Sequence, residues 1–345
     1  MAYQTSQAPL RVGLIGAGTI GKMRAQALAK IPEIFQLVAI ADTNNDLAQK
    51  LAGYGVKCFA DPIELANDPQ VDAVILSTPP VSHGPIGLAC LHAGKHLLVE
   101  KPLAASVQEC EDLVNAAEKA GVCLATGFTL RQTPAARLAK KLLVEGAIGE
   151  LDHIRALHGH KGGKDFGPLW ITENKVTGGG TLMDNGIHLI DLARWFLGDT
   201  ETFMGMASNN VWQKPGCEDN GFVLMRSAAG RIASVQGSWT EWRGYGWRME
   251  IFGSSGAIRF GFPPLWLTHW QGTPGEKMKS KHYPFLKYQI TERLRGWQWS
   301  LIETLVGDLA DWGEAIRASK VAPASGRDGL ESVRIALCTD FAKRA

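Results

Sequence analysis

The chain has no marked excess of charge of either sign. Its 36 Lys and Arg residues nearly balance 34 Asp and Glu residues, which gives a net charge of +2. Proteins that bind nucleic acid usually carry a larger basic excess, so we expect no nucleic-acid partner. Long apolar runs are also missing, and the start, MAYQTSQAPL, has neither the basic nor the apolar region of a signal peptide. We therefore expect a cytoplasmic protein with no membrane partner.

Cysteine is scarce and scattered. Six cysteines occur in 345 residues, with no CxxC pair and no spacing typical of a metal site. Such cysteines are typical of buried or incidental thiols in a reducing compartment, and we expect no bound metal. The composition is otherwise that of an ordinary globular protein, with 45% hydrophobic and 20% charged residues. The length suits two domains, each large enough to bury its own core.

A glycine motif near the start predicts a dinucleotide site. A short apolar run from Arg11 leads into Gly16-x-Gly18-x-x-Gly21, and an Ala-rich helical pattern follows. In this motif one glycine makes a tight turn, one lets the backbone approach a pyrophosphate, and one allows close packing of helix on strand. The N-terminus of the helix then receives the phosphates.

An acidic residue at the end of the next apolar run supports this interpretation. The run from Leu37 to Ala41 ends at Asp42, which lies 21 residues after Gly21. A carboxylate about that far along usually hydrogen-bonds the adenosine ribose hydroxyls and repels a 2′-phosphate. The sequence therefore favours NAD over NADP.

Strand and helix patterns alternate through the first 130 residues. The segments are strands at Ala73 to Ser77 and His96 to Glu100, helices at His83 to Ala93 and Ser106 to about Ala120, and a sixth strand at Val122 to Thr126. Such alternation is typical of a doubly wound parallel sheet. We expect an α/β Rossmann domain over residues 1–130 that binds NAD.

In doubly wound sheets, ligands bind beyond the carboxyl ends of the strands. Two short segments fall at such ends, Thr78-Pro79-Pro80 and Glu100-Lys101-Pro102. This topology places Lys101 at the predicted ligand site. The alternative is a solvated lysine that merely follows a strand, which is common for surface lysines.

The segment GGGTLMDNGIHLIDLARWFLG, from Gly178 to Gly198, reads as one helix with Thr181 as N-cap. Asp184, His188 and Asp191 stand at i, i+4 and i+7, so they share a face. Thr181 and Asp184 also form a capping-box pattern, which explains Asp184 without any catalytic role. His188 could be an ordinary buried histidine, but it is flanked by apolar residues and must find polar partners if buried.

After Gly149 the alternation of strand and helix patterns ends, and successive strand patterns joined by turns follow. The candidate strands are Leu151 to Leu157, Phe203 to Val211, Phe222 to Arg226, Arg231 to Thr240, Arg248 to Phe252 and Ala257 to Phe260, with hairpin turns at Ser227 to Gly230 and Gly253 to Gly256. This pattern predicts an α+β domain over residues 131–345, built on an open, mostly antiparallel sheet. The helix from Thr181 and the amphipathic run from Ser300 to Arg317 are expected to cover one face.

These motifs together resemble the Gfo/Idh/MocA oxidoreductases, the glucose-fructose oxidoreductase and inositol dehydrogenase family. The similarity runs from about Arg11 to Gly198 and recurs in EIFGSSGAI, from Glu250 to Ile258. Its most specific parts are the EKP tripeptide at Glu100 and the D-x-G-x-H-like run from Asp184 to His188.

The resemblance implies catalytic roles for Lys101, Asp184 and His188. It also implies dimers or tetramers formed through the open sheet, and a carbohydrate as the small-molecule substrate. With the glycine motif included, the expected cofactor-binding residues are Gly16, Gly18, Thr19, Ile20, Gly21, Asp42, Thr78, Pro79, His83, Glu100 and Lys101.

Substrate contacts are expected from segments that look peculiar to this chain. The candidates are Arg131, His160, Lys161, Lys164 and Trp170. A cationic loop at 158–164 suits a polar or anionic sugar group, although His158-x-His160 also fits part of a metal site. Seven of the eleven tryptophans lie between residues 239 and 299. We expect most of them to fill cores and interfaces and the others to stack on sugar rings.

The leading hypothesis is an NAD-dependent dehydrogenase that acts on a secondary hydroxyl of a sugar, polyol or derivative, possibly an acidic one. His188 would take the hydroxyl proton while Lys101 stabilises the charge that develops on the oxygen. A second hypothesis is a glycosidase that oxidises a ring hydroxyl transiently, eliminates the aglycone, adds water and restores the hydroxyl. The third is a dinucleotide-binding regulator without catalysis, since fold alone does not establish chemistry.

Overall fold

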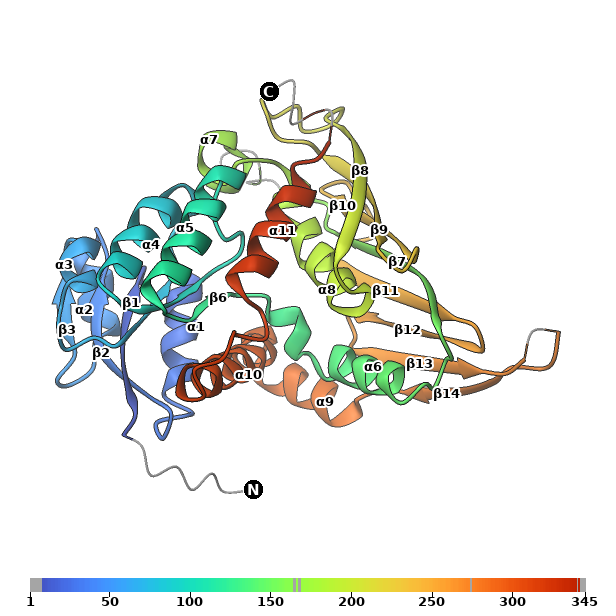
Figure 1. Cartoon of the computed structure of the whole chain (residues 1–345), viewed down its shortest axis with the longest axis horizontal. Coiled ribbons are helices and arrows are strands. Elements are labelled where there is room, and N and C mark those ends of the chain that lie inside the picture. The colour runs from blue at the N-terminus through green and yellow to red at the C-terminus, as the bar shows by residue number, and fades with distance from the viewer. Residues whose placement is uncertain (1–7, 164–165, 167–168, 274, 340, 342–345) are drawn as a thin grey trace. The chain divides into compact units, whose positions relative to one another are not determined.

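The structure, a computed structural model, describes residues 8–163, 166, 169–273, 275–339 and 341. They form two compact units, one from Met1–Thr129 and Trp297–Leu330, the other from Leu130–Gly296 and Glu331–Ala345 (Figure 1). This division differs from the predicted one, because residues 297–330 return to the first unit. Within the described ranges, none of the helices has the length and apolar character needed to cross a bilayer.

The first unit contains a six-stranded parallel sheet in the order β3-β2-β1-β4-β5-β6. Its strands are β1 (Leu10–Ile15), β2 (Phe35–Ala41), β3 (Lys57–Phe59), β4 (Ala73–Leu76), β5 (His96–Val99) and β6 (Leu124–Thr126). The doubly wound parallel sheet is thus confirmed, and the strand order reverses between β1 and β4. The three-residue strand β3 was not named in the sequence analysis, because so short a run carries little periodicity.

Helices follow the strands as the alternation predicts. They are α1 (Thr19–Leu28), α2 (Asn45–Leu51), α3 (Pro62–Ala66), η1 (Pro80–Ser82), α4 (His83–His92), α5 (Val107–Ala120), η2 (Thr129–Gln132), α10 (Trp297–Arg317) and α11 (Gly326–Ala336). The capping signal at Ser106 is confirmed, since its hydroxyl accepts a hydrogen bond from the backbone N–H of Glu109. The boundary at Leu330 falls within α11.

The helix α10 packs on the Rossmann sheet, so the expectation that residues 300–317 cover the antiparallel sheet is wrong. Its buried residues Leu305, Leu309 and Trp312 join the core of the first unit. The Trp312 ring stacks on Phe35 of β2 with centroids 5.4 Å apart. Close approach needs a glycine at 313, because a Cβ there would lie 2.4 Å from a side-chain carbon of Ile34. Amphipathicity predicted a covered face but could not say which sheet covers it.

A buried ion network ties α1 to α10 and to the end of β5. Arg24 is fully buried on α1, and its guanidinium donates to Glu100 at 2.7 Å and to Asp308 of α10 at 2.7 Å. Burial raises the pKa of the Asp308 carboxyl despite the neighbouring guanidinium. Two carboxylates thus depend on one cation in a site with little water.

The second unit contains an eight-stranded sheet in the order β14-β13-β12-β11-β7-β10-β9-β8. Its strands are β7 (Leu151–Gly159), β8 (Thr200–Ser208), β9 (Asn220–Ser227), β10 (Ile232–Ser238), β11 (Gly246–Gly253), β12 (Gly256–Phe262), β13 (Trp266–Gln271) and β14 (Lys279–Tyr283). Among the described strands, β7 and β10 pair in parallel and the other neighbours pair antiparallel. The open, mostly antiparallel sheet is confirmed, while β13 and β14 extend it beyond the predicted strands.

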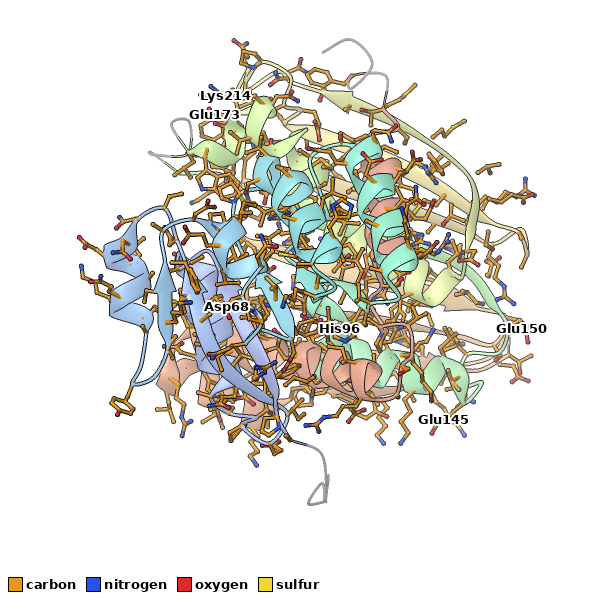
Figure 2. All side chains as sticks on the ribbon, turned by 60° about the vertical axis from the view of Figure 1, so that its left-hand side comes forward. Asp68, His96, Glu145, Glu150, Glu173 and Lys214 are labelled. Atoms are coloured by element: carbon orange, nitrogen blue, oxygen red, sulfur yellow. The ribbon has the colours of Figure 1, made fainter. Side chains whose placement is uncertain are left out.

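Both predicted hairpin turns occur where the glycines stand. The backbone N–H of Gly230 donates to Ser227 at 2.8 Å, and the second turn joins β11 to β12 at Gly253 and Gly256. Glu150 lies beside this second turn, directly before β7 (Figure 2). Its backbone carbonyl oxygen accepts a hydrogen bond from the N–H of Ser254 at 2.8 Å.

Helices cover one face of this sheet and leave part of the other open. The helices of this unit are α6 (Pro134–Val144), η3 (Trp170–Thr172), α7 (Asn174–Thr177), the π-helical turn η4 (Leu182–Gly186), α8 (Ile187–Leu197) and α9 (Leu286–Arg295), and α6, η4 and α8 pack on the strands. As predicted, the segment after Thr181 packs on the sheet, with η4 and α8 both against β10 and β7. On β9 the residues alternate, so that Val223 and Met225 are buried while Phe222 and Leu224 are exposed.

Replacing Arg24 by Met is expected to destabilise the first unit by about 3–5 kcal/mol, because two buried carboxylates lose their cation. Urea unfolding of the full chain measures this loss. The matched control is Lys30→Met, which breaks an exposed ion pair between a residue just after α1 and Glu303 of α10. That change should cost less than about 1 kcal/mol. Equal losses in the two variants would show that the buried network does not stabilise the unit.

Candidate active site

The glycine motif of the first unit makes a tight turn after β1, and each of its glycines has different surroundings. Gly16 has φ +95°, and a Cβ there would lie 2.6 Å from the carbonyl oxygen of Ser77. At Gly21 a Cβ would lie 1.8 Å from the carbonyl oxygen of Gly16. At Gly18, by contrast, no described atom lies within 4 Å of a Cβ position. The backbone at Gly18 is therefore open to a ligand.

Helix α1 starts at this open position. Its N-cap is Gly18, which has no side chain to cap the helix, and its first residues are Thr19 and Ile20. The N–H groups of the first turn and the positive end of the helix dipole are suited to a pyrophosphate. The loop and helix therefore fit the diphosphate of a dinucleotide.

Asp42 stands at the end of β2, where the sequence placed it. One carboxylate oxygen accepts from the N–H of Ala17 at 2.7 Å and the other accepts from the N–H of Asn44 at 2.8 Å. The carboxylate therefore holds the glycine loop in position. This contact adds a structural task to the expected contact with ribose hydroxyls.

His83 joins the turns that follow β4 and β5. Its ring lies buried, with Nδ1 2.9 Å from the carbonyl oxygen of Pro102 and Nε2 2.8 Å from that of Thr78. Burial lowers the pKa of the imidazole, and a neutral ring donates one of these two hydrogen bonds. With its ring enclosed, His83 would influence a cofactor through the Thr78–Pro79 and Lys101–Pro102 turns.

The catalytic candidate Lys101 follows β5 and is partly buried. The residue before it, Glu100, accepts from Arg24 and is thereby fixed by the buried ion network. Gly127 keeps room for this pair, since a Cβ there would lie 2.8 Å from Arg24 and 2.9 Å from Glu100. The role of Arg24 could not be predicted from the sequence, because an arginine inside a helical pattern gives no sign of its partners.

In the second unit, the turn that carries Asp184 is π-helical, and the predicted Thr181 capping box is wrong. The cap is Glu218, which precedes β9. Its carboxylate accepts from the N–H groups of Gly180 and Leu182, each at 2.8 Å, and its carbonyl oxygen accepts from the N–H of Thr181 at 3.0 Å. One residue thus satisfies three successive N–H groups that a helix start leaves without partners.

This cap is enclosed by the protein. A Cβ at Gly180 would lie 2.3 Å from the backbone nitrogen of Glu218, so the glycine permits the close approach. Burial raises the pKa of the Glu218 carboxyl to about 6. Because capping residues from distant segments leave no local pattern, the sequence could not reveal this one.

Asp184 faces away from the helix start and is held by other groups. Its Oδ2 accepts from the indole Nε1 of Trp239 at 3.1 Å and lies 3.7 Å from Nε2 of His160. His160 follows β7 and Trp239 follows β10, and these two strands are the parallel pair of the sheet. Their carboxyl ends therefore converge on the carboxylate that the sequence singled out.

His188 lies beside a second histidine. The ring of His158 is 5.9 Å from that of His188 and 5.5 Å from the ring of Tyr245, measured between centroids. Nδ1 of His158 is 3.0 Å from the carbonyl oxygen of Asn185 in the π-helical turn. A carbonyl only accepts, so His158 carries its proton on Nδ1. The structure thus gathers Asp184, His188, His160 and Tyr245 into one polar cluster.

Arg131, which the sequence predicts as a ligand contact, has a structural partner. Its guanidinium binds Asp191 of α8 through two hydrogen bonds, at 2.8 and 2.5 Å, and both side chains are buried. Asp191 is the third acidic or basic residue on the predicted helix face. The pair anchors α8 from its side.

Two further predicted substrate residues are exposed. Lys161 is exposed on the loop after β7, and Trp170 is about half exposed in η3. Neither takes part in the contacts described above, and Lys164 lies outside the described residues. No group of three or more His, Cys, Asp or Glu side chains suited to a metal ion occurs in the described part of the chain.

Comparison with known proteins identifies both units. A family model described as "Oxidoreductase family, NAD-binding Rossmann fold" (GFO_IDH_MocA) matches residues 10–128. A second, described as "GFO/IDH/MocA C-terminal domain", matches residues 136–259.

Curated relatives and solved structures agree with these matches. Myo-inositol 2-dehydrogenase of Thermotoga maritima is 32% identical over 255 residues, which cover 72% of this chain and 74% of that one. Levoglucosan dehydrogenase of Pseudarthrobacter phenanthrenivorans is 29% identical over 73% of this chain and 74% of that one. A solved structure of levoglucosan dehydrogenase with NADH is 26% identical and has a TM-score of 0.84, covering 97% of this chain and 96% of that chain.

The buried cap predicts a pH dependence of stability. The folded protein binds the Glu218 proton more tightly than the unfolded chain, so the contribution to stability is complete below about pH 4.5 and is lost as pH rises through about 6. Relative to Glu218→Gln, the wild type should lose about 2 kcal/mol of unfolding free energy across this window. Urea unfolding at several pH values measures the difference.

The control for this prediction is Glu173→Gln, the same change at an exposed glutamate of the same unit (Figure 2). Its stability curve should run parallel to that of the wild type. A parallel curve for Glu218→Gln as well would contradict the assigned role of the buried carboxylate.

Proposed function

The chain belongs to the Gfo/Idh/MocA oxidoreductase family as an NAD-dependent sugar or polyol dehydrogenase, and from this premise we propose that it oxidises a ring hydroxyl with Lys101, Asp184 and His188 as catalytic residues. The observation that carries the proposal is the polar cluster at the carboxyl ends of β7 and β10. It holds the Asp184 carboxylate by a hydrogen bond from Trp239 and places the ring of His188, four residues further along the chain, 5.9 Å from that of His158. Bound NAD supplies the acceptor for the hydride that leaves the substrate carbon.

His188 is proposed as the base that takes the proton of the reacting hydroxyl. A neutral imidazole suits this task near neutral pH. Two features support the neutral form, namely the apolar residues that flank His188 and the second imidazole ring of His158 at 5.9 Å. A neighbouring ring that becomes protonated would disfavour a second positive charge.

Lys101 is proposed to hydrogen-bond the reacting oxygen and to stabilise its developing negative charge. Its place after β5 is at the carboxyl edge of the sheet, where doubly wound folds bind their ligands. The residues Glu100 and Pro102 on either side are fixed by Arg24 and His83. We propose that this restraint keeps the ammonium in one position during turnover.

The substrate class is proposed from the relatives and from the local chemistry. The relatives described above are named for inositol and levoglucosan, which are polyhydroxylated rings. In the second unit, the polar cluster brings together the Asp184 carboxylate, imidazoles and the Tyr245 phenol, and such groups hydrogen-bond several hydroxyls at once. We propose a neutral or weakly acidic ring polyol, with Lys161 available to an acidic substituent.

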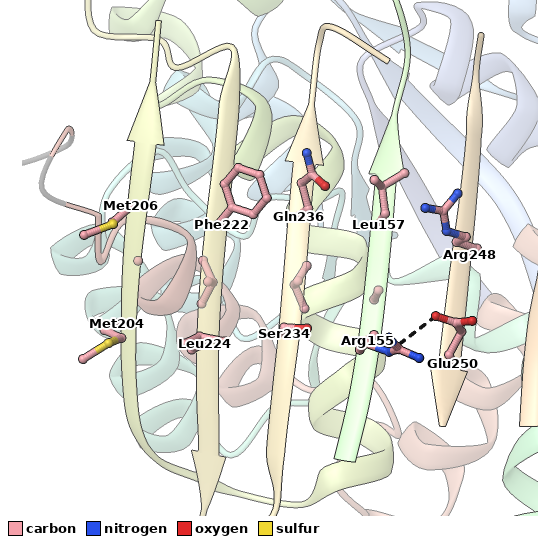
Figure 3. Close-up of a pocket in the computed structure, with 14 residues that line it drawn as sticks. Arg155, Leu157, Met204, Met206, Phe222, Leu224, Ser234, Gln236, Arg248 and Glu250 are labelled. Atoms are coloured by element: carbon pink, nitrogen blue, oxygen red, sulfur yellow. Dashed lines mark ion pairs between the residues drawn. The ribbon is translucent and has the colours of Figure 1, made fainter. Parts of the chain in front are cut away.

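An open face of the eight-stranded sheet supports a homo-oligomer. Met204, Met206, Phe222 and Leu224 are all exposed there and border a groove of about 590 Å³ (Figure 3). Arg155 and Glu250 form an ion pair at the other side of the groove, 3.6 Å apart. Contiguous apolar surface rimmed by charge is typical of protein interfaces. We propose that a second copy of the chain covers this face.

A cytoplasmic location is proposed on the state of the cysteines. All six are free thiols in the structure, as a reducing compartment would keep them.

The function is tested by incubating the purified protein with NAD and a panel of ring polyols, sugars and glycosides. Absorbance of NADH and release of free sugar are followed together. The wild type should form NADH with at least one ring polyol or sugar. Release of sugar from a glycoside without net NADH would favour the redox-neutral glycosidase, and neither signal across the panel would favour a non-catalytic regulator.

With any active compound, Lys101→Met should lower kcat by about 10²- to 10³-fold or more, because the negative charge that develops on the reacting oxygen loses the lysine ammonium that stabilises it. NAD binding, measured by calorimetry, should stay close to that of the wild type since the glycine loop is unchanged. The control Lys119→Met alters an exposed lysine of the same unit and should leave both values unchanged. Near-normal turnover in Lys101→Met would refute the assignment.

Replacing Leu224 by Glu should dissociate the oligomer, because it places a charge within the apolar contact. Sedimentation velocity is expected to show a multiple of the single-chain mass for the wild type and a single-chain mass for the variant. Val144→Glu, at an exposed apolar residue of α6 outside the groove, is the control and should not change the mass. A wild type that sediments as a single chain would contradict the proposed interface.

A further inference from the structure

A fully buried tryptophan donates a hydrogen bond to the catalytic candidate Asp184. Trp239 directly follows β10, has no exposed surface, and reaches Oδ2 of Asp184 through its indole Nε1 at 3.1 Å. An indole N–H can donate a hydrogen bond but cannot accept one. The contact is therefore available only to an oxygen that accepts.

The position of Trp239 is fixed by its backbone as well as by its ring. Its N–H donates to the carbonyl oxygen of Asp219 at 2.7 Å, and its carbonyl oxygen accepts from the indole of Trp212 at 3.0 Å. The ring packs edge-on against Phe166 with centroids 5.1 Å apart. Asp219 is buried too, and its carboxylate accepts from the N–H of Val211 at 2.6 Å. These contacts fix the direction in which the indole N–H of Trp239 points.

The second group near the same oxygen is also oriented as a donor. The N–H of Gly162 donates to Nδ1 of His160 at 2.9 Å, which leaves the ring proton on Nε2. That nitrogen lies 3.7 Å from Oδ2 of Asp184. Trp239 and His160 therefore face Oδ2 with N–H groups from two different segments.

We infer that Trp239 is a positioning residue for the proposed reaction, one that holds Asp184 as an oriented anion so that the proton of the substrate hydroxyl is carried by His188. The inference rests on the proposed function. A donor-only N–H favours the ionised carboxylate over the acid. With Asp184 kept ionised, the negative charge stabilises the imidazolium that His188 becomes when it accepts the proton.

Other titratable groups surround this carboxylate. They are His160 after β7, Tyr245 before β11, His188 on α8, and His158, whose ring lies beside both Tyr245 and His188. Glu241 lies beside His160, since its N–H donates to the His160 carbonyl, and it is neutralised by Arg243 through two hydrogen bonds. Unlike these groups, the Trp239 indole does not titrate. Its hydrogen bond to Asp184 is therefore available at every working pH.

The kinetic test compares Trp239→Phe with Trp247→Phe. Trp247 is a buried tryptophan of the same unit that packs against Phe260, so the two changes remove the same atoms. With a substrate from the panel, Trp239→Phe should lower kcat by about 10- to 100-fold, as expected for one hydrogen bond to a charged group. The acid limb of kcat/KM against pH should move to higher pH, while the KM for NAD stays constant. Trp247→Phe should share neither change.

A second measurement needs no turnover. In a ¹⁵N spectrum of the indole groups, the signal lost in Trp239→Phe identifies Trp239. This signal should shift in Asp184→Asn, because the indole N–H loses its charged acceptor. A signal that Asp184→Asn leaves unmoved would overturn the inference.

The outcomes separate the inference from the function on which it rests. A wild type that is inactive across the panel refutes the proposed function, whereas an active wild type with equal kinetics for Trp239→Phe and Trp247→Phe refutes the positioning role. If Trp239→Phe does not fold, His160→Phe keeps the packing against Phe166 and removes the second donor. It should move the acid limb in the same direction by a smaller amount, and an unmoved limb would contradict the inference.

Discussion

The helix that carries Asp184 and His188 begins on the buried carboxylate of Glu218. Three successive backbone N–H groups end on this one residue, two on its carboxylate and one on its carbonyl oxygen. A buried helix start without partners would cost several kcal/mol. Since π-helical turns are frequent at functional sites, the cap stabilises the irregular segment on which the proposed chemistry depends. The placement of Asp184 and His188 in the polar cluster depends on this start, whereas strand ends place the other members.

Both units place their reactive groups by the same topological rule. In the Rossmann unit, parallel strands bring Asp42, Thr78 and Lys101 to one edge of the sheet. In the second unit, one parallel pair, β7 and β10, occurs within a largely antiparallel sheet, and its carboxyl ends supply His160 and Trp239. Parallel strands end together, so residues distant in sequence meet without long loops. Rigid strand ends position side chains better than mobile loops do.

The parts of the fold that the sequence predicts are those with local signals. The glycine motif, the strand alternation, the Ser106 cap and the hairpin glycines each depend on neighbouring residues, and each was confirmed. The errors concern partners from distant segments. Thr181 has the right spacing for a cap, yet Glu218 takes that role from 37 residues away. Likewise α10 is amphipathic, but amphipathicity does not specify which sheet it covers.

The candidate site divides in the same way. Motif spacing identifies Asp184, His188 and Lys101 as candidates, because their neighbours form recognisable patterns. Trp239, Arg24 and Glu218 were missed, since a single Trp, Arg or Glu in an ordinary strand or helix pattern carries no signal of its contacts. Arg131 was expected to meet a ligand, whereas its partner Asp191 was known only as the third residue of a helix face.

Direct hydride transfer from a substrate carbon to NAD, on which the proposed function depends, is tested most directly by deuterium labelling. An active compound from the panel is prepared with deuterium on the carbon that bears the reacting hydroxyl, and the products are analysed by mass spectrometry. One deuterium per turnover should appear in the reduced cofactor, and none should appear in water. Deuterium released to the solvent, or retained on a freed sugar without net reduction of NAD, would contradict the proposed dehydrogenase mechanism.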